Sequence, residues 1–231
     1  MHVPDGFLDA TTSVATGAVA VAGVALALRG ARRDLDDRTA PMAGLVATFV
    51  FATQMLNFPV GAGTSGHLLG GALAAILVGP WTGLLCVSVV VIVQALLFAD
   101  GGITALGTNI TLMSIVGVLV GWLVFRCLSS VLPKKVAVVA PCAAVAAFVA
   151  VPATALVFVG LYAVGGTAPI PLDTLTTAML GWHVLIGIGE AVITGLVIGS
   201  VTAVRPDLVY GARRALKSRP LEIRGVTGAA A

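Results

Sequence analysis

Charged residues are scarce in this sequence. Only 10% of its 231 residues are charged, whereas about a quarter are charged in a typical soluble domain. Aromatic residues make up 6%, while hydrophobic residues make up 58% and the mean hydropathy is +1.08. This composition excludes a soluble globular domain and indicates an integral membrane protein.

Cysteine clusters and nucleotide-binding motifs are also missing. The cysteines Cys86, Cys127 and Cys142 do not have the spacing of a metal knuckle, and we interpret them as small apolar residues of helices. No phosphate loop or dinucleotide fingerprint is present. We therefore expect this chain to bind no nucleotide, so any dependence on ATP must come from another subunit.

Long apolar stretches dominate what is present. Seven can be marked, at residues 11–29, 41–57, 66–79, 81–98, 105–127, 135–165 and 174–204. The third is short, about 21 Å as a helix, and forms a hairpin with the fourth around Gly79-Pro80-Trp81. The sequence predicts an all-α polytopic membrane protein with about seven transmembrane helices. Residues 1–204 form one domain, and residues 205–231 form a basic tail.

The basic residues predict the orientation. All 13 follow the first, fifth or seventh stretch: Arg29, Arg32, Arg33, Arg38; Arg126, Lys134, Lys135; Arg205, Arg213, Arg214, Lys217, Arg219 and Arg224. If all seven stretches cross the membrane, the three basic regions lie on one side, which must be the cytoplasm. If the short third stretch does not cross, the basic regions are divided between the two sides. We expect the N-terminus outside, no cleaved signal peptide, and a cytoplasmic C-terminal tail that meets anionic lipid headgroups or a partner.

The N-terminus carries a potential metal chelate. The α-amine of Met1, the amide nitrogen of His2 and Nδ1 of His2 can close two fused chelate rings in one plane. A fourth nitrogen would complete the square geometry that suits Ni(II), Cu(II) and some Co(II). His67 is the remaining histidine on the outer side, within a glycine-rich segment, and Pro4 and Gly6 can turn the terminus towards it. A solvated terminal histidine is the alternative.

Other polar residues occur within the apolar stretches. His183 and Glu190 are seven residues apart, on one face of the last helix, and an ionisable residue in a membrane helix is a functional candidate. They either form interhelical contacts or act as a proton relay. Asn57, Gln94 and Asn109 are interpreted as residues that fix helix contacts or support a ligand shell.

An enzymatic interpretation rests on the segment Gly63-Thr64-Ser65-Gly66. It matches the G-x-S-G pattern of intramembrane serine proteases of the rhomboid type, for which His183 would be the base. The pattern is short and common in glycine-rich chains. Ser65 is explained more simply as a helix N-cap, with Thr64 beside it in the same turn.

Four longer motifs resemble the cobalt/nickel family of energy-coupling factor (ECF) transporters, in its substrate-binding component of the CbiM/NikM type. They are MHVPDGF, FPVGAGTSGHLLGGALAAILVGPW, QALLFADGGITALGTNI and HVLIGIGEAVITG. The resemblance implies a seven-helix S component that holds a divalent metal through Met1, His2 and His67. It covers the chain to about residue 204.

The resemblance also implies a function in the plasma membrane of a prokaryote. The chain would capture Co²⁺ or Ni²⁺ outside and deliver it to the cytoplasm, and the motifs lean towards cobalt, for cobalamin biosynthesis. Its partners would be a transmembrane coupling (T) component, ATP-binding cassette ATPase subunits and a small accessory membrane protein. A proton-coupled secondary transporter that uses His183 and Glu190 is the alternative, and the serine protease of Ser65 and His183 is a remote one.

Overall fold

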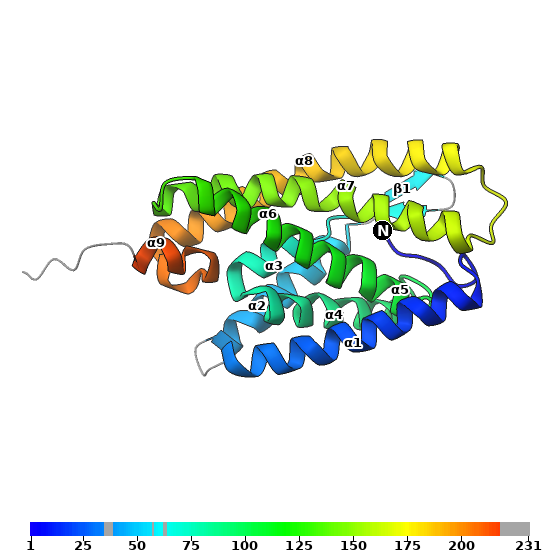
Figure 1. The fold of residues 1–231 in the computed structure, drawn as a ribbon, viewed down its shortest axis with the longest axis horizontal. Coiled ribbons are helices and arrows are strands. Elements are labelled where there is room, and N and C mark those ends of the chain that lie inside the picture. Colours follow the sequence, from blue (N-terminus) through cyan, green and yellow to red (C-terminus); the bar gives the residue numbers. More distant parts are fainter. Residues whose placement is uncertain (35–38, 57, 62–63, 218–231) are drawn as a thin grey trace, which may run out of the picture.

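The computed structural model describes residues 1–34, 39–56, 58–61 and 64–217. Within these residues the chain forms a bundle of long helices, most of which run along the longest axis of the molecule (Figure 1). The longest are α1 (Ala10–Asp34), α4 (Pro80–Leu97), α7 (Val139–Gly165) and α8 (Leu172–Val204). α2 (Thr39–Gln54) and α3 (Gly71–Val78) are shorter.

One further long helix combines three segments. α5 (Leu106–Asn109), a π-helical stretch η1 (Ile110–Val116) and α6 (Gly117–Val131) follow one another without a break. Short elements complete the chain: the 3₁₀ turns η2 (Val136–Val138), η3 (Pro206–Leu208) and η4 (Tyr210–Ala212), and the helix α9 (Arg213–Lys217). The predicted all-α architecture is confirmed.

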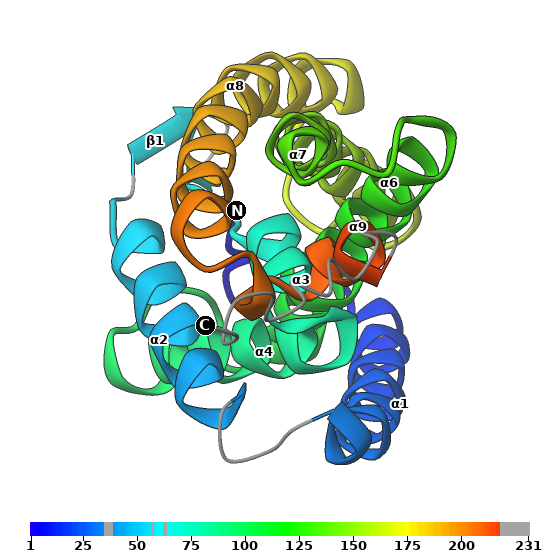
Figure 2. The same cartoon turned by 90° about the vertical axis from the view of Figure 1, so that its left-hand side faces the viewer.

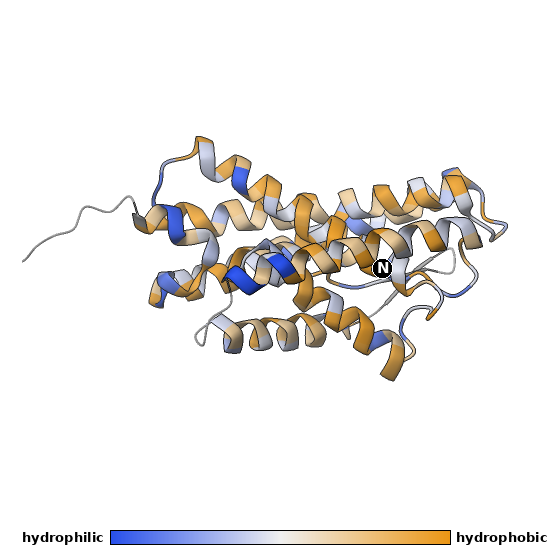
Figure 3. Cartoon of the chain, turned by 60° about the horizontal axis from the view of Figure 1, so that its bottom comes forward, coloured by the Kyte–Doolittle hydropathy of each residue, from blue (hydrophilic) through white to orange (hydrophobic). Residues whose placement is uncertain are grey.

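The predicted apolar stretches all contain helices, but they differ in length. In the described part of the chain, five helical segments are long and apolar enough to cross a membrane: Ala10–Arg33, Pro80–Leu97, Leu106–Val131, Val136–Gly165 and Leu172–Val204. The helices are apolar along most of their length (Figure 3), and large apolar side chains face outwards, as a lipid environment requires. A polytopic membrane protein is confirmed, whereas the orientation of the termini stays a prediction.

The third stretch, expected over 66–79, forms a helix of only eight residues. α3 lies inside the bundle of longer helices, and all of its residues are buried (Figure 2). The prediction was wrong about its beginning, because residues 67–70 are not helical. Gly70, with φ +72°, is the N-cap, so the interpretation of Ser65 as a helix N-cap is also wrong.

A short β-hairpin precedes α3 and was not expected. β1 (Phe58–Gly61) and β2 (Thr64–Gly66) pair antiparallel, with Phe58 opposite Gly66 and Pro59 opposite Ser65. The hairpin lies beside α8 (Figures 1 and 2). The residues that follow it, from His67 to Gly70, enter the bundle as an irregular segment.

Candidate metal centre

The first nine residues fold back into the helical bundle. A turn with a hydrogen bond from Phe7 N–H to the Pro4 carbonyl (3.4 Å), and with Gly6 at φ +71°, reverses the chain before α1. Met1 is 1% exposed and His2 is 6% exposed, so the terminus is inside the protein rather than in solvent. Figure 1 shows the terminus between α7 and the lower helices.

The side chain of Asn109 binds the backbone of the N-terminal segment. Its Oδ1 accepts a hydrogen bond from Val3 N–H (2.7 Å), and its Nδ2 donates to the Val3 carbonyl (3.1 Å). Gly102 N–H donates to the same carbonyl (2.9 Å). Val3 is fully buried, so these bonds satisfy backbone groups that water cannot reach.

Further contacts hold the turn. The N–H and the hydroxyl of Thr104 donate to Oδ1 of Asp5 (2.7 and 2.5 Å). These hydrogen bonds lower the pKa of the Asp5 carboxyl. Thr167 N–H donates to the Phe7 carbonyl (3.1 Å), and the Phe7 ring packs against the rings of Phe158 and Tyr162. The segment is therefore anchored on both sides of its turn.

The folded-back terminus brings its nitrogen to His67. The nitrogen of Met1 contacts Nε2 of His67. Nδ1 of His67 lies 2.7 Å from the Leu68 carbonyl, which can only accept, so Nδ1 carries the proton and Nε2 keeps a lone pair. The rings of His2 and His67 have centroids 4.6 Å apart. The donors that the sequence analysis selected are thus neighbours in space.

Two polar side chains hold the segment that carries His67. The Glu190 carboxylate accepts hydrogen bonds from Leu69 N–H (2.8 Å) and Gly70 N–H (2.6 Å). Gln54 Nε2 donates to the Leu69 carbonyl (2.7 Å). Glu190 is almost fully buried on the inner face of α8, and both of its oxygens bind backbone. Glu190 therefore fixes the backbone that follows His67.

The segment between α4 and α5 packs closely against His2. Nε2 of His2 lies 3.5 Å from the Asp100 carboxylate. Gly101 has φ +92°, and a Cβ there would lie 2.9 Å from Nδ1 of His2. A Cβ on Gly102 would lie 2.4 Å from the backbone nitrogen of Asp5. Only glycine permits this approach, which explains the Asp-Gly-Gly order after α4.

Burial keeps the terminal nitrogens neutral. It lowers the pKa of the Met1 amine from 8.0 to about 4, although the Asp100 charge opposes the shift. Burial, and then the neighbouring amine, lower the pKa of His2 from 6.5 to about 3. At neutral pH both groups therefore hold lone pairs that a cation can accept.

His183 lies near the same nitrogens. Its imidazole is fully buried in α8, and its Nδ1 bonds the Met179 carbonyl (2.7 Å). Its Nε2 has no hydrogen-bond partner among the described residues, and it is within electrostatic range of the Met1 amine and of His67.

The remaining candidates are less informative. The Gln94 side chain is buried, and neither of its polar atoms has a hydrogen-bond partner among the described residues. The backbones of Thr64 and Ser65 belong to β2, but their side chains, like all of Asn57, lie outside the described residues.

In the part of the chain that is described, no group of three His, Cys, Asp or Glu side chains is arranged to hold a metal. The potential donors instead include an amine and a backbone amide. The roles of Asp100, Gly101, Gly102 and Gln54 around these donors were not recognised from sequence. The Asp-Gly-Gly order was the one signal available for the first three.

Comparison with known proteins gives a consistent result. The family described as CbiM, cobalt uptake substrate-specific transmembrane region, matches residues 2–208. A putative metal transport protein of Haloquadratum walsbyi is 40% identical over 210 residues, which cover 91% of this chain and 94% of that protein. A fused nickel transport protein of Rhodobacter capsulatus, NikMN, is 33% identical over 90% of this chain and 64% of its own length.

Solved structures are similar as well. The crystal structure of a truncated transition metal transporter superposes with a TM-score of 0.81 at 31% identity, and covers 88% of this chain and 99% of that one. These similarities, together with the apolar helices, describe a multi-pass membrane protein of a prokaryote.

Proposed function

The chain belongs to the CbiM family of cobalt uptake substrate-specific transmembrane regions, and we propose that it is the metal-capturing subunit of an ATP-driven importer of the energy-coupling factor type. The family membership makes it a membrane component of cobalt or nickel transport. The proposal adds the site, the direction of transport and the partners.

The contact between the Met1 nitrogen and Nε2 of His67 carries the proposal. We propose that Co²⁺ or Ni²⁺ is bound by these two nitrogens together with the amide nitrogen and Nδ1 of His2. The Met1 and His2 nitrogens are three consecutive donors of one chelate, and the His67 imidazole is the fourth donor. Four such nitrogens suit a square-planar site, in which Ni(II) binds more tightly than Co(II). The family description names cobalt, so both metals belong in the test.

The neighbouring residues orient these donors. Asp100 faces Nε2 of His2, so a proton on Nε2 would leave the lone pair on Nδ1, where the chelate needs it. The Leu68 carbonyl holds the proton of His67 on Nδ1 and leaves Nε2 free for the metal. The nearby His183 would support this site without ligating, and the Gln94 backbone carbonyl accepts a hydrogen bond from the N–H of Asp100 (3.1 Å), which faces His2.

Capture and delivery then follow from the topology. We propose that the N-terminal side faces outwards, that the hydrated cation loses water to the nitrogens, and that the N-terminal segment closes over it. Release into the cytoplasm requires a coupling membrane protein and ATP-binding cassette ATPases. The similar fused nickel transport proteins are longer than the region matched here, and a small accessory membrane protein would take the place of that extra part.

The test measures Ni²⁺ and Co²⁺ binding by isothermal titration to purified full-length protein with Met1 at its N-terminus. His2→Ala and His67→Ala are expected to abolish high-affinity binding of both metals. Adding two glycines before Met1 should do the same, because it moves the amine away from His2 and does not make His2 the third residue, where the amine, two amide nitrogens and the imidazole would form a new square chelate. Two glycines added at the C-terminus are the matched control. Unchanged binding after the N-terminal addition would exclude the terminal amine as a ligand.

A second measurement addresses the importer. Uptake into vesicles should require the coupling and ATPase subunits and should stop without ATP. Transport by the chain alone, driven by a proton gradient, would instead identify a secondary transporter.

A further inference from the structure

A positively charged hollow lies at the opposite end of the bundle from the N-terminal segment. Two adjacent cavities there share Ser129, Gly211 and Arg214, and measure about 280 and 20 Å³. The larger is walled by the aromatic rings of Trp122 and Tyr210. Figure 1 shows α9, which carries Arg214, at this end, far from the N-terminus.

Three guanidinium groups supply the charge of the larger cavity. Arg126, Arg213 and Arg214 line it, and no acidic side chain does so among the described residues. We call these three arginines, with Trp122 and Tyr210, the basic hollow. Lys134 and Lys135 line the smaller cavity next to it. Such a concentration of one sign of charge in a recess attracts an anion.

Two of the arginines are held by aromatic rings. The Arg126 guanidinium lies 5.6 Å from the centre of the Trp122 ring, and that of Arg213 lies 4.3 Å from the centre of the Tyr210 ring. Stacking of this kind uses the face of the guanidinium and leaves the N–H donors at its edge available, in the fork that suits a phosphate group.

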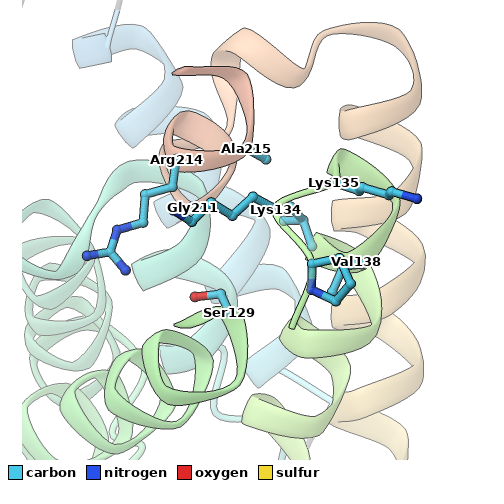
Figure 4. Close-up of a pocket in the computed structure, with 9 residues that line it drawn as sticks. Ser129, Lys134, Lys135, Val138, Gly211, Arg214 and Ala215 are labelled. Carbon is cyan, nitrogen blue, oxygen red and sulfur yellow. The ribbon is translucent and has the colours of Figure 1, made fainter. Parts of the chain in front are cut away.

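The charge of the basic hollow is not neutralised within the described residues. Arg205, at the same end, binds both carboxylate oxygens of Asp207 (3.0 and 2.8 Å). Arg126, Arg213 and Arg214 have no such carboxylate partner among the described residues. The Arg214 side chain and the Ser129 hydroxyl turn to the same side, whereas the Lys135 ammonium points away from the recess (Figure 4).

The position relative to the apolar helices identifies the kind of anion. α6 ends at Val131, α7 begins at Val139 and α8 ends at Val204, so the basic hollow lies where membrane-spanning helices terminate. Val131 is 80% exposed and Leu132 is 41% exposed beside it. A ligand with a phosphate group and an apolar tail can use both surfaces, whereas free phosphate uses one.

We propose that the basic hollow binds the headgroup phosphate of an anionic phospholipid from the adjacent leaflet. The guanidinium groups of Arg126, Arg213 and Arg214 donate to the phosphate, and the acyl chains lie against the exposed apolar residues at the end of α6. This site is independent of the metal site and of the proposed direction of transport.

Native mass spectrometry of the full-length protein tests the proposal, with phosphatidylglycerol and phosphatidylcholine as probes. The test protein carries Arg126→Gln, Arg213→Gln and Arg214→Gln. The matched control carries Arg29→Gln, Arg32→Gln and Arg33→Gln, which removes the same charge from exposed side chains at the C-terminal end of α1. Unchanged Ni²⁺ binding shows that each protein is folded.

The unmodified and control proteins are expected to retain one phosphatidylglycerol in preference to phosphatidylcholine. The test protein should bind phosphatidylglycerol at least about tenfold more weakly. Equal losses in test and control, or no preference for the anionic lipid, would overturn the proposal. So would displacement of the lipid by millimolar inorganic phosphate, which would identify a free-phosphate site. Unchanged lipid binding with lost assembly of partner subunits would identify a protein-docking surface instead.

Discussion

Asn109 pairs with the backbone of Val3 as one strand residue pairs with another, through hydrogen bonds of 2.7 and 3.1 Å across 106 residues of sequence. An amide side chain at the start of the π-helical stretch thereby holds the N-terminal segment inside the bundle. The position of the first two residues depends on this pair, because Val3 is the next residue along the chain.

Replacement of Asn109 by alanine should weaken metal binding. It leaves the N–H of buried Val3 without its partner and removes a donor to its carbonyl, which costs about 1–3 kcal/mol, or about five- to 150-fold in affinity. Thr111→Val is the matched control, because it removes a buried hydrogen bond to Thr16 that does not touch the N-terminal segment. Titration calorimetry with Ni²⁺ measures both. Equal affinities of the two variants would contradict the role given to Asn109.

Asp100→Asn should lower metal affinity about 10–100-fold, because His2 loses the carboxylate that favours a proton on Nε2. Asp173→Asn removes the same charge from an exposed position in the first turn of α8 and should have little effect. The absorption spectrum of the Co²⁺ or Cu²⁺ complex reports whether His2 still ligates. If both variants lose affinity equally, Asp100 acts through long-range charge and not by orienting His2.

Gly101→Ala tests the close packing against His2. The added Cβ would lie 2.9 Å from Nδ1 of His2, at a backbone φ of +92°. Gly6→Ala introduces comparable backbone strain at φ +71°, but its Cβ would meet no atom within 4 Å. Both variants should pay about 1–2 kcal/mol of strain. Only Gly101→Ala should also displace Nδ1 and reduce Ni²⁺ affinity further, and similar affinities would contradict the steric argument.

Glu190→Gln separates a structural carboxylate from a proton relay. In the structure, each carboxylate oxygen of Glu190 accepts one hydrogen bond, from Leu69 N–H or from Gly70 N–H. A glutamine keeps a single oxygen, so its NH₂ group would face one of these two N–H donors and that hydrogen bond would be lost. We expect at least about tenfold weaker metal binding with an unchanged pH dependence of uptake. Thr202→Val, which removes a hydrogen bond within α8, is the control. Normal affinity together with uptake that no longer depends on pH would favour the relay.

Metal binding should weaken as the pH falls. In the folded protein the amine has a pKa of about 4, against 8.0 when it is exposed, so protons favour the undocked terminus. Docking is therefore strongest above pH 8 and is lost progressively as the pH falls from 8 towards 4. For each proton that metal binding releases, the metal affinity should fall about tenfold for every unit by which the pH is lowered in this range. Titrations between pH 8 and 5 that give a constant affinity would rule out this competition.

Local patterns in the sequence predicted the structure of this chain best. Runs of apolar residues predicted the long helices, because a helix that meets lipid must be apolar along its whole length. The beginning of the third helix was misjudged because the irregular residues 67–70 continue directly into the apolar helix α3 and are themselves mostly apolar or glycine. Hydropathy does not distinguish the two segments. The hairpin of β1 and β2 was missed because glycine-rich strands carry no alternating pattern.

By itself, the sequence determined that this chain spans a membrane, and it predicted the terminal amine, His2 and His67 as nitrogens for a metal. Composition and side-chain type are enough for those conclusions. Only the tertiary structure decided that these nitrogens meet. The contacts of Asn109 with Val3, Asp100 with His2 and Glu190 with Gly70 join residues about 100 positions apart. Such pairings depend on how the helices pack together, and local hydrophobic periodicity does not record that packing.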